Sequence, residues 1–305
     1  MGEWGSFERL CRASTLPVCN LFPGAPVKEC ILRGAGGKVR NIGDICLCIL
    51  ALLFTLKLVW KTRMKSVTIG GREIQLFLFG YFLATFLQVF SIGGWLIDRT
   101  VLKWFSALDV AAIVGTAWVL MFVAIAGLTH EVMKGVVLFM VGTDGHSYIQ
   151  RAKGLMFFDA IAYPGYGCSA LRGLQSAFDF PGHDPGPPGS SWESHTLFVL
   201  NIVLPVFTVI TYFIISAVIS LHILGETKPL YPLAYAFTGS LFALIFTFVV
   251  SDDICRSTHA RIDGSMLATL SVLVAVYNVW KFWDVTTEDD FMDIAVDSDG
   301  GSTRD

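Results

Sequence analysis

Long apolar runs separated by short polar joints make up most of this chain. An α-helix needs about twenty residues to cross a bilayer, and six of the runs are close to this length. They occupy Ile42–Trp60, Ile74–Ile97, Ala107–Leu128, Thr196–Leu221, Leu233–Val250 and Gly264–Trp280. Because lipid offers the backbone no hydrogen-bond partners, such runs predict transmembrane helices. The pattern therefore predicts an all-α membrane protein.

The stretch between the third and fourth runs, His130–Pro188, is less regular. Its two apolar pieces, Gly135–Val141 and Gly154–Ala162, are too short to cross a bilayer by themselves. We predict a weak further helix near Ala152–Leu171, covered by its neighbours, and then a polar loop rich in Pro and Gly around residues 173–195. The expected fold is a seven-helix transmembrane bundle in which this fourth helix is weak. Six helices are the alternative.

Polar segments flank the predicted membrane domain, which covers residues 42–283. Residues 1–41 mix charged residues, prolines and cysteines, which predicts a small extramembrane amino-terminal cap. They lack the basic start and apolar core of a cleaved signal peptide, so we expect the first helix to serve as the insertion signal. Residues 284–305 are acidic and poor in apolar residues, which predicts a disordered cytosolic tail.

Four cysteines lie outside the apolar runs, at Cys11, Cys19, Cys30 and Cys255. In an oxidising lumen they would form disulfides with three possible pairings, among which the sequence does not choose. The alternative is free thiols on a loose cytosolic tail. An odd number of helices places the cap and Cys255 on the same side of the membrane, whereas an even number separates them. We predict a lumenal cap that is bonded to Cys255.

The joint after the first run is short and basic, with Lys61, Arg63, Lys65 and Arg72. Short loops rich in Lys and Arg favour the cytosolic face of a membrane. Lys38 and Arg40, just before the first run, are a counter-signal. Charge alone therefore orients the chain only weakly.

Composition narrows the function classes. Of 305 residues, 54% are hydrophobic and 15% charged, which is too apolar and too poor in charge for a soluble globular protein. The formal net charge of −3 gives no basic excess to neutralise phosphates, so we expect no nucleic-acid partner.

The densest group of polar residues is the segment from Ser251 to Asp263. A zinc site there would need three or four ligands, and His259 has no second histidine nearby. We interpret the segment instead as a loop ordered by hydrogen bonds, with Asp263 near the positive end of the last helix. No catalytic or cofactor motif accompanies it.

Asp109 is the acidic residue within the third apolar run. Since it lies in the first turn of the predicted helix, we interpret it as an interfacial carboxylate at a helix start. A role in an ion pathway is the alternative.

A family resemblance emerges at the end of the chain. The order of Ser251, Asp252, Cys255, His259, Asp263 and Gly264, followed by Lys281, Phe282, Trp283 and Asp284, resembles the carboxy-terminal signature of the fungal chitin synthase export chaperones. Gly5–Phe7 with Cys11 and Cys19, and the basic joint from Lys61 to Ile74, resemble two further motifs of that family. The chain departs from the family's pattern at residues 130–194.

The resemblance implies a non-enzymatic, multi-pass protein of the endoplasmic reticulum membrane without a cofactor. Such a protein would bind a chitin synthase and help it leave this compartment in support of cell wall chitin synthesis. Export-coat components are further candidate partners.

Small and amide residues in the runs suit close helix contacts, either with such a client or within the bundle itself. They are Gly80, Ala84, Gly115, Asn201, Gly239 and Asn278. The main rival function is a seven-helix receptor or sensor for a small ligand. A second rival, an intramembrane enzyme or transporter, would need paired ionisable residues deep in the spans.

Overall fold

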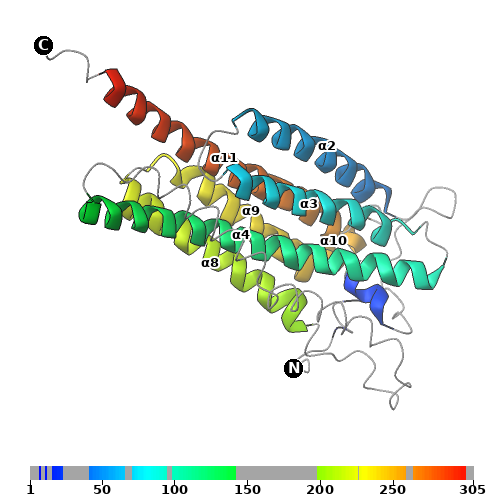
Figure 1. The fold of residues 1–305 in the computed structure, drawn as a ribbon. Helices are drawn as coiled ribbons and strands as arrows, with labels where there is room; N and C mark the ends of the chain where they lie inside the picture. The colour runs from blue at the N-terminus through cyan, green and yellow to red at the C-terminus, as the bar shows by residue number, and fades with distance from the viewer. Residues whose placement is uncertain are drawn as a thin grey trace, which may run out of the picture.

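The computed structural model describes residues 7, 11, 16–22, 41–65, 71–94, 98–141, 198–225, 227–258 and 264–299. All regular structure within these residues is helical, and six of the helices are long and apolar enough to cross a membrane. They form an elongated bundle (Figure 1). The prediction of an all-α membrane protein is confirmed. The predicted fourth helix near Ala152–Leu171 and the loop at 173–195 lie outside the described residues.

The first half of the chain contains the short 3₁₀ helix η1 (Pro17–Leu21) and the helices α2 (Ile42–Met64), α3 (Gly71–Ile92) and α4 (Arg99–Val141). The helix α2 starts after Asn41, whose positive φ of 53° is one that asparagine tolerates. Two glycines follow α3, and the second, Gly94, also has a positive φ. The chain therefore turns there, before the predicted end of the helix at Ile97.

The start of α4 corrects a prediction. The sequence predicts this span from Ala107, but the helix begins at Arg99. Its 43 residues correspond to a length of about 65 Å, twice the thickness of the hydrocarbon core. The charged residues of the first turns extend the helix outward instead of interrupting it. Asp109 consequently lies about three turns inside α4 and not at its start.

The second half begins with one continuous helix in three parts, which are η2 (Val199–Val203), α8 (Leu204–Val218) and η3 (Ile219–Leu224). Pro205 lies within this helix, where a proline lacks the backbone N–H of an ordinary residue and can kink the helix. The structure places a π-helical turn directly before the proline, and the hydroxyl of Thr208 donates a hydrogen bond to the Pro205 carbonyl. A wider turn is one way to accommodate the proline ring and the missing backbone N–H of this residue.

The chain continues with α9 (Leu230–Phe248), α10 (Ser251–Ser257) and α11 (Gly264–Asp299). The predicted polar loop after Val250 therefore begins as a short helix. The helix α11 continues past Trp280 to Asp299, into the segment that the sequence predicts to be a disordered tail. Figure 1 shows this last part of α11 projecting beyond the other helices.

The bundle has two ends, which we name by what lies there. The cap end carries η1 and the starts of α2, α4 and α11. The clamp end carries the end of α2 and the region around Asp284, where an ionic cluster joins α2 to α11. The helices α4 and α8 run in the same direction, because Phe198 and Val110 share one cluster at the cap end while Ile219 lies beside Gly127 further along. Along the bundle, α4 therefore ends toward the clamp end, whereas α8 begins at the cap end.

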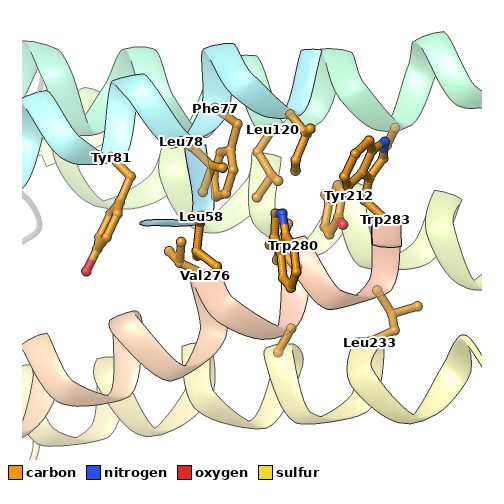
Figure 2. Packing of buried hydrophobic residues seen from close by; sticks show 14 of the residues in the cluster. Leu58, Phe77, Leu78, Tyr81, Leu120, Tyr212, Leu233, Val276, Trp280 and Trp283 are labelled. Carbon is orange, nitrogen blue, oxygen red and sulfur yellow. The ribbon is translucent and has the colours of Figure 1, made fainter. Parts of the chain in front are cut away.

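The centre of the bundle is a cluster of buried apolar and aromatic side chains from α2, α3, α4, α8, α9 and α11. Figure 2 shows Leu58, Leu78 and Leu120 facing Trp280 and Tyr212 in this cluster. The large side chains on the outer surface are also apolar, as on α2, where Leu50, Leu53 and Leu56 are exposed. An apolar interior with an apolar exterior is the pattern of a bundle that lies in lipid.

Candidate functional site

The first site is an ionic cluster at the clamp end that joins α2 to α11. The Asp284 carboxylate accepts hydrogen bonds from Lys65 at 2.7 Å and from Lys281 at 3.0 Å, one on each oxygen. Only 7% of the Asp284 side chain is exposed, whereas the two lysine side chains are 38% and 40% exposed. The buried anion is thus held between two half-exposed cations, and charge-assisted bonds of this length are the strong kind.

An indole completes this cluster. The Trp280 ring nitrogen donates a 2.9 Å hydrogen bond to the hydroxyl of Thr62, and the Lys61 ammonium lies 5.4 Å from a Trp280 ring centroid. The Thr62 hydroxyl in turn donates to the Leu58 carbonyl, so the buried hydroxyl both donates and accepts a hydrogen bond. We call Lys61, Thr62, Lys65, Trp280, Lys281 and Asp284 the clamp. It unites the basic joint and the end of the carboxy-terminal signature.

The other residues of the basic joint and of the segment 281–284 differ in burial. Trp283 is buried in the central cluster and Phe282 packs against it. Arg63 and Arg72 are exposed and therefore keep their charge at the surface. Sequence reasoning named the charged members of the clamp but missed Thr62, since a lone threonine in an apolar run gives no signal of its partner.

The second site is the cap. Cys11 and Cys19 form a disulfide, and with Phe7, Val18, Leu21 and Phe22 they pack on Ala107 and Val110 of α4. The Phe7 ring also contacts the ring of Phe198, at 5.9 Å between centroids. Cys30 lies outside the described residues, and the side chain of Cys255 in α10 is not described either. The predicted bond from Cys255 to the cap stays a prediction, with Cys30 as the one candidate partner left among the four cysteines.

A polar network lies directly beneath the cap. The amide of Asn20 in η1 donates to the Ser91 carbonyl at 3.1 Å and to the Ser106 hydroxyl at 3.0 Å. The Ser91 hydroxyl lies 2.7 Å from Oδ2 of Asp109. Asp109 is completely buried, so our interpretation of it as an interfacial carboxylate was wrong. The sequence indicated the wrong helix start because the charged residues before Ala107 interrupt the apolar run, although they belong to α4.

A third contact ties α2 to α11 at the cap end. The Asn41 amide donates to the hydroxyl of Ser265, and that hydroxyl lies 3.4 Å from the carboxylate of Asp44. The signature residue Gly264 has its place here for a steric reason. A Cβ at this position would collide with the Phe246 carbonyl and with the backbone and side chain of Ser251.

The other residues of the signature segment are only partly visible. Ser251 is buried at the start of α10, where a side chain on Gly264 would meet it. Asp252 belongs to α10 without a described side chain, and His259 and Asp263 lie outside the described residues. Within the part of the chain that the structure covers, no three His, Cys, Asp or Glu side chains are placed to hold a metal ion.

The small residues divide into two groups. A Cβ on Gly80 would lie 2.7 Å from the Thr116 hydroxyl of α4, and one on Gly239 would lie 3.1 Å from the Ser271 carbonyl of α11. These glycines, with the buried Ala84, therefore serve packing within the bundle. Gly115 has nothing within 4 Å of such a Cβ, and Asn201 and Asn278 are half-buried. The latter three remain available to a partner in the membrane.

Comparison with known proteins points to one family. A sequence model of the family described as "Chitin synthase export chaperone" matches residues 3–297. A protein of that name from Neurospora crassa is 24% identical over 302 residues, which cover 95% of this chain and 78% of the relative. The counterpart from Cryptococcus neoformans is 24% identical and covers 94% and 76%, and that from Aspergillus fumigatus is 23% identical and covers 94% and 84%.

No solved structure matches the chain. The family match extends over nearly all of the sequence, and it includes the cap, the clamp and the six membrane-competent helices. The chain therefore belongs to the chitin synthase export chaperone family.

Proposed function

We propose that this protein is a non-enzymatic chaperone of the endoplasmic reticulum membrane that binds a chitin synthase and helps it leave that compartment. The family match over residues 3–297 supports this function, and the relatives are named chitin synthase export chaperones. The observation that carries it best is the clamp. Two motifs that resemble the family's, about 200 residues apart in sequence, meet in one buried ionic contact.

The direction of the helices supports a seven-pass topology. Since α4 ends at the clamp end and α8 starts at the cap end, residues 142–197 must pass from one end of the bundle to the other. If the six described helices all span the bilayer, this connection crosses it once more. The predicted fourth helix near Ala152–Leu171 is the segment we propose for that crossing. An odd number of crossings places the amino terminus and carboxy terminus on opposite sides.

We assign the cap end to the lumen and the clamp end to the cytosol. The cap carries a disulfide, which persists in the oxidising lumen and is rare in the cytosol. The clamp end carries the basic residues Lys61, Arg63, Lys65 and Arg72, which favour the cytosolic side. Both signals give the same orientation. In this orientation the last part of α11 projects into the cytosol, where export-coat components could reach it.

Client binding requires a surface within the membrane that the bundle does not already use. Gly115 on α4 leaves space at the helix surface, where a client helix can approach closely. The Asn278 amide on α11 donates only to its own Val274 carbonyl in the described contacts, so its oxygen can accept from a client. These two positions are our candidates for transient contacts with the membrane helices of a chitin synthase.

Removal of the gene tests this function. A fluorescently tagged chitin synthase should remain in the endoplasmic reticulum of cells that lack this protein, and the wild-type chain should restore its transport. Asp284→Ala, which breaks the clamp, should restore less transport than Arg63→Ala, which removes a charge from the same joint without touching the clamp. Normal transport of every chitin synthase in the deletion strain would refute the proposal.

A further inference from the structure

In the polar network beneath the cap, one serine hydroxyl faces two acceptors. The Ser91 hydroxyl is within hydrogen-bond distance of two acceptors, which are Oδ2 of Asp109 at 2.7 Å and the Gln88 carbonyl at 3.2 Å. A serine hydroxyl has a single hydrogen and can donate it fully to only one of them. The carbonyl of Gln88 can only accept. With a proton on Oδ2 of Asp109, both contacts become full hydrogen bonds, because Oδ2–H can donate to Ser91 while Ser91 donates to the Gln88 carbonyl.

The second oxygen of Asp109 points to the same conclusion. Oδ1 is buried and has no hydrogen-bond partner among the described residues. An ionised carboxylate at this place would have one hydroxyl to stabilise a full negative charge within the membrane bundle. A neutral carboxylic acid leaves only a carbonyl-like oxygen without a partner, and this costs far less than an unpaired buried charge.

The described residues around Asp109 supply no positive charge that could neutralise an ionised carboxylate. The two ion pairs formed within the described part of the chain both use Asp284, at the opposite end of the bundle. On α2, the buried ionisable groups at this end are the Cys48 thiol and the Asp44 carboxyl group, and neither of these two brings a positive charge. On α3 the neighbours are the neutral Ser91 and Gln88, and η1 contributes the neutral amide of Asn20.

We propose that Asp109 is a buried proton-binding site, in which Oδ2–H donates to Ser91, Ser91 donates to the Gln88 carbonyl, and the bound proton keeps the cap attached to the bundle. This inference does not depend on the proposed function. It assigns the side-chain hydrogens of Asp109, Ser91 and Asn20. Asn20 then uses both of its amide hydrogens for the Ser91 carbonyl and Ser106, and this is how η1 is held to α3 and α4.

Loss of the proton would rearrange these bonds. The proton would go to water, and Asp109 would become a carboxylate that needs donors for both oxygens. The Ser91 hydroxyl would turn from the Gln88 carbonyl to Oδ2, and the remaining donors of the network are the Ser106 hydroxyl and the Asn20 amide. If the amide turned toward the carboxylate, it would give up the bonds that hold the cap. The cap would therefore loosen when Asp109 ionises.

Infrared spectroscopy of the purified protein in nanodiscs at neutral pH tests the proton directly. We expect the carbonyl stretch of a protonated carboxyl group in the wild type, with a shift in D₂O. The band should be lost in Asp109→Asn and kept in Asp44→Asn, the matched control with the other buried aspartate at the cap end. Should Asp109→Asn not fold, Ser91→Ala with isotope-labelled aspartate serves instead and should shift the band. Absence of a protonated band, or its loss in Asp44→Asn alone, would overturn the assignment.

Hydrogen exchange of residues 16–22, corrected for its intrinsic pH dependence, tests the coupling to the cap. In the wild type, protection should fall as the pH rises through the point where the infrared band disappears. In Asp109→Asn it should stay constant. A cap whose protection is independent of pH in both proteins, or equally dependent in both, would refute the coupling. If Na⁺ instead of pH controlled protection, the site would bind a metal cation and the proton assignment would be wrong.

Discussion

Replacement of Lys65 and Lys281 by methionine, singly and together, measures how strongly the clamp fastens α2 to α11. Methionine keeps most of the length of the side chain and removes only the ammonium group. In each single variant, one lysine still donates to the buried Asp284 carboxylate. In the double variant the carboxylate has lost both of the partners described here.

The magnitudes follow from the exposure of the three groups. The lysines are 38% and 40% exposed, so solvent screens each bond, and we expect each single variant to cost about 1 kcal/mol. The carboxylate is 7% exposed, and a buried charge without partners costs about 3–5 kcal/mol. The double variant should therefore lose about 1–3 kcal/mol more than the sum of the single variants.

The assay is equilibrium unfolding in mixed detergent micelles, followed by the fluorescence of the tryptophans. Trp280 and Trp283 are buried beside the clamp, so their emission should report its opening. Arg63→Met is the matched control, since Arg63 is an exposed cation of the same joint, and it should cost less than about 0.5 kcal/mol. Additive single effects, within about 0.5 kcal/mol, would show that the lysines do not share a buried anion and would refute this reasoning.

Three further predictions concern packing, the cap and the topology. Gly239→Ala should destabilise the bundle by about 1–3 kcal/mol in the same unfolding assay, because its methyl group meets the Ser271 carbonyl, whereas Gly115→Ala should not destabilise it; equal effects would contradict the assigned helix contacts. Cys11→Ser should lower the free energy of unfolding by about 2–3 kcal/mol and increase proteolysis of the cap. The control Cys46→Ser replaces an exposed free cysteine and should change neither quantity. A stable cap that resists proteolysis without the disulfide would refute the stabilising role of the disulfide. Gly189→Asn creates a glycosylation sequon with Ser191 in the predicted loop before α8, and Gly300→Asn creates one with Ser302 in the tail. The first variant should be glycosylated and the second should not. Gel mobility with and without glycosidase measures both. The opposite pattern would reverse the proposed orientation.

The membrane helices could be predicted from sequence because each needs a long apolar run, and the six described spans correspond to the six runs. The helix boundaries could not be predicted in the same way. Charged residues end the apolar signal but do not end a helix, because their side chains can reach water from a helix that continues beyond the lipid. This is why α4 starts at Arg99 and why α11 continues to Asp299.

The candidate sites were predictable as motifs but not as contacts. The basic joint and the carboxy-terminal signature each stood out in the sequence, yet nothing in either one shows that Lys65 reaches Asp284, which is 219 positions away. The network of Asn20, Ser91 and Asp109 gave even less signal, since serine and asparagine are ordinary residues in helices and turns. Its members come from three elements that only the folded bundle brings together.

The proposed function requires that a chitin synthase binds to this chain before the synthase leaves the endoplasmic reticulum. The most direct test is affinity purification of the tagged protein from its own cells in mild detergent, followed by mass spectrometry. A chitin synthase should be recovered with the wild type, at a level that falls in Asn278→Leu with Gly115→Leu but not in the control Leu53→Val on the lipid-facing side of α2. Recovery of no chitin synthase with the wild type would contradict the account.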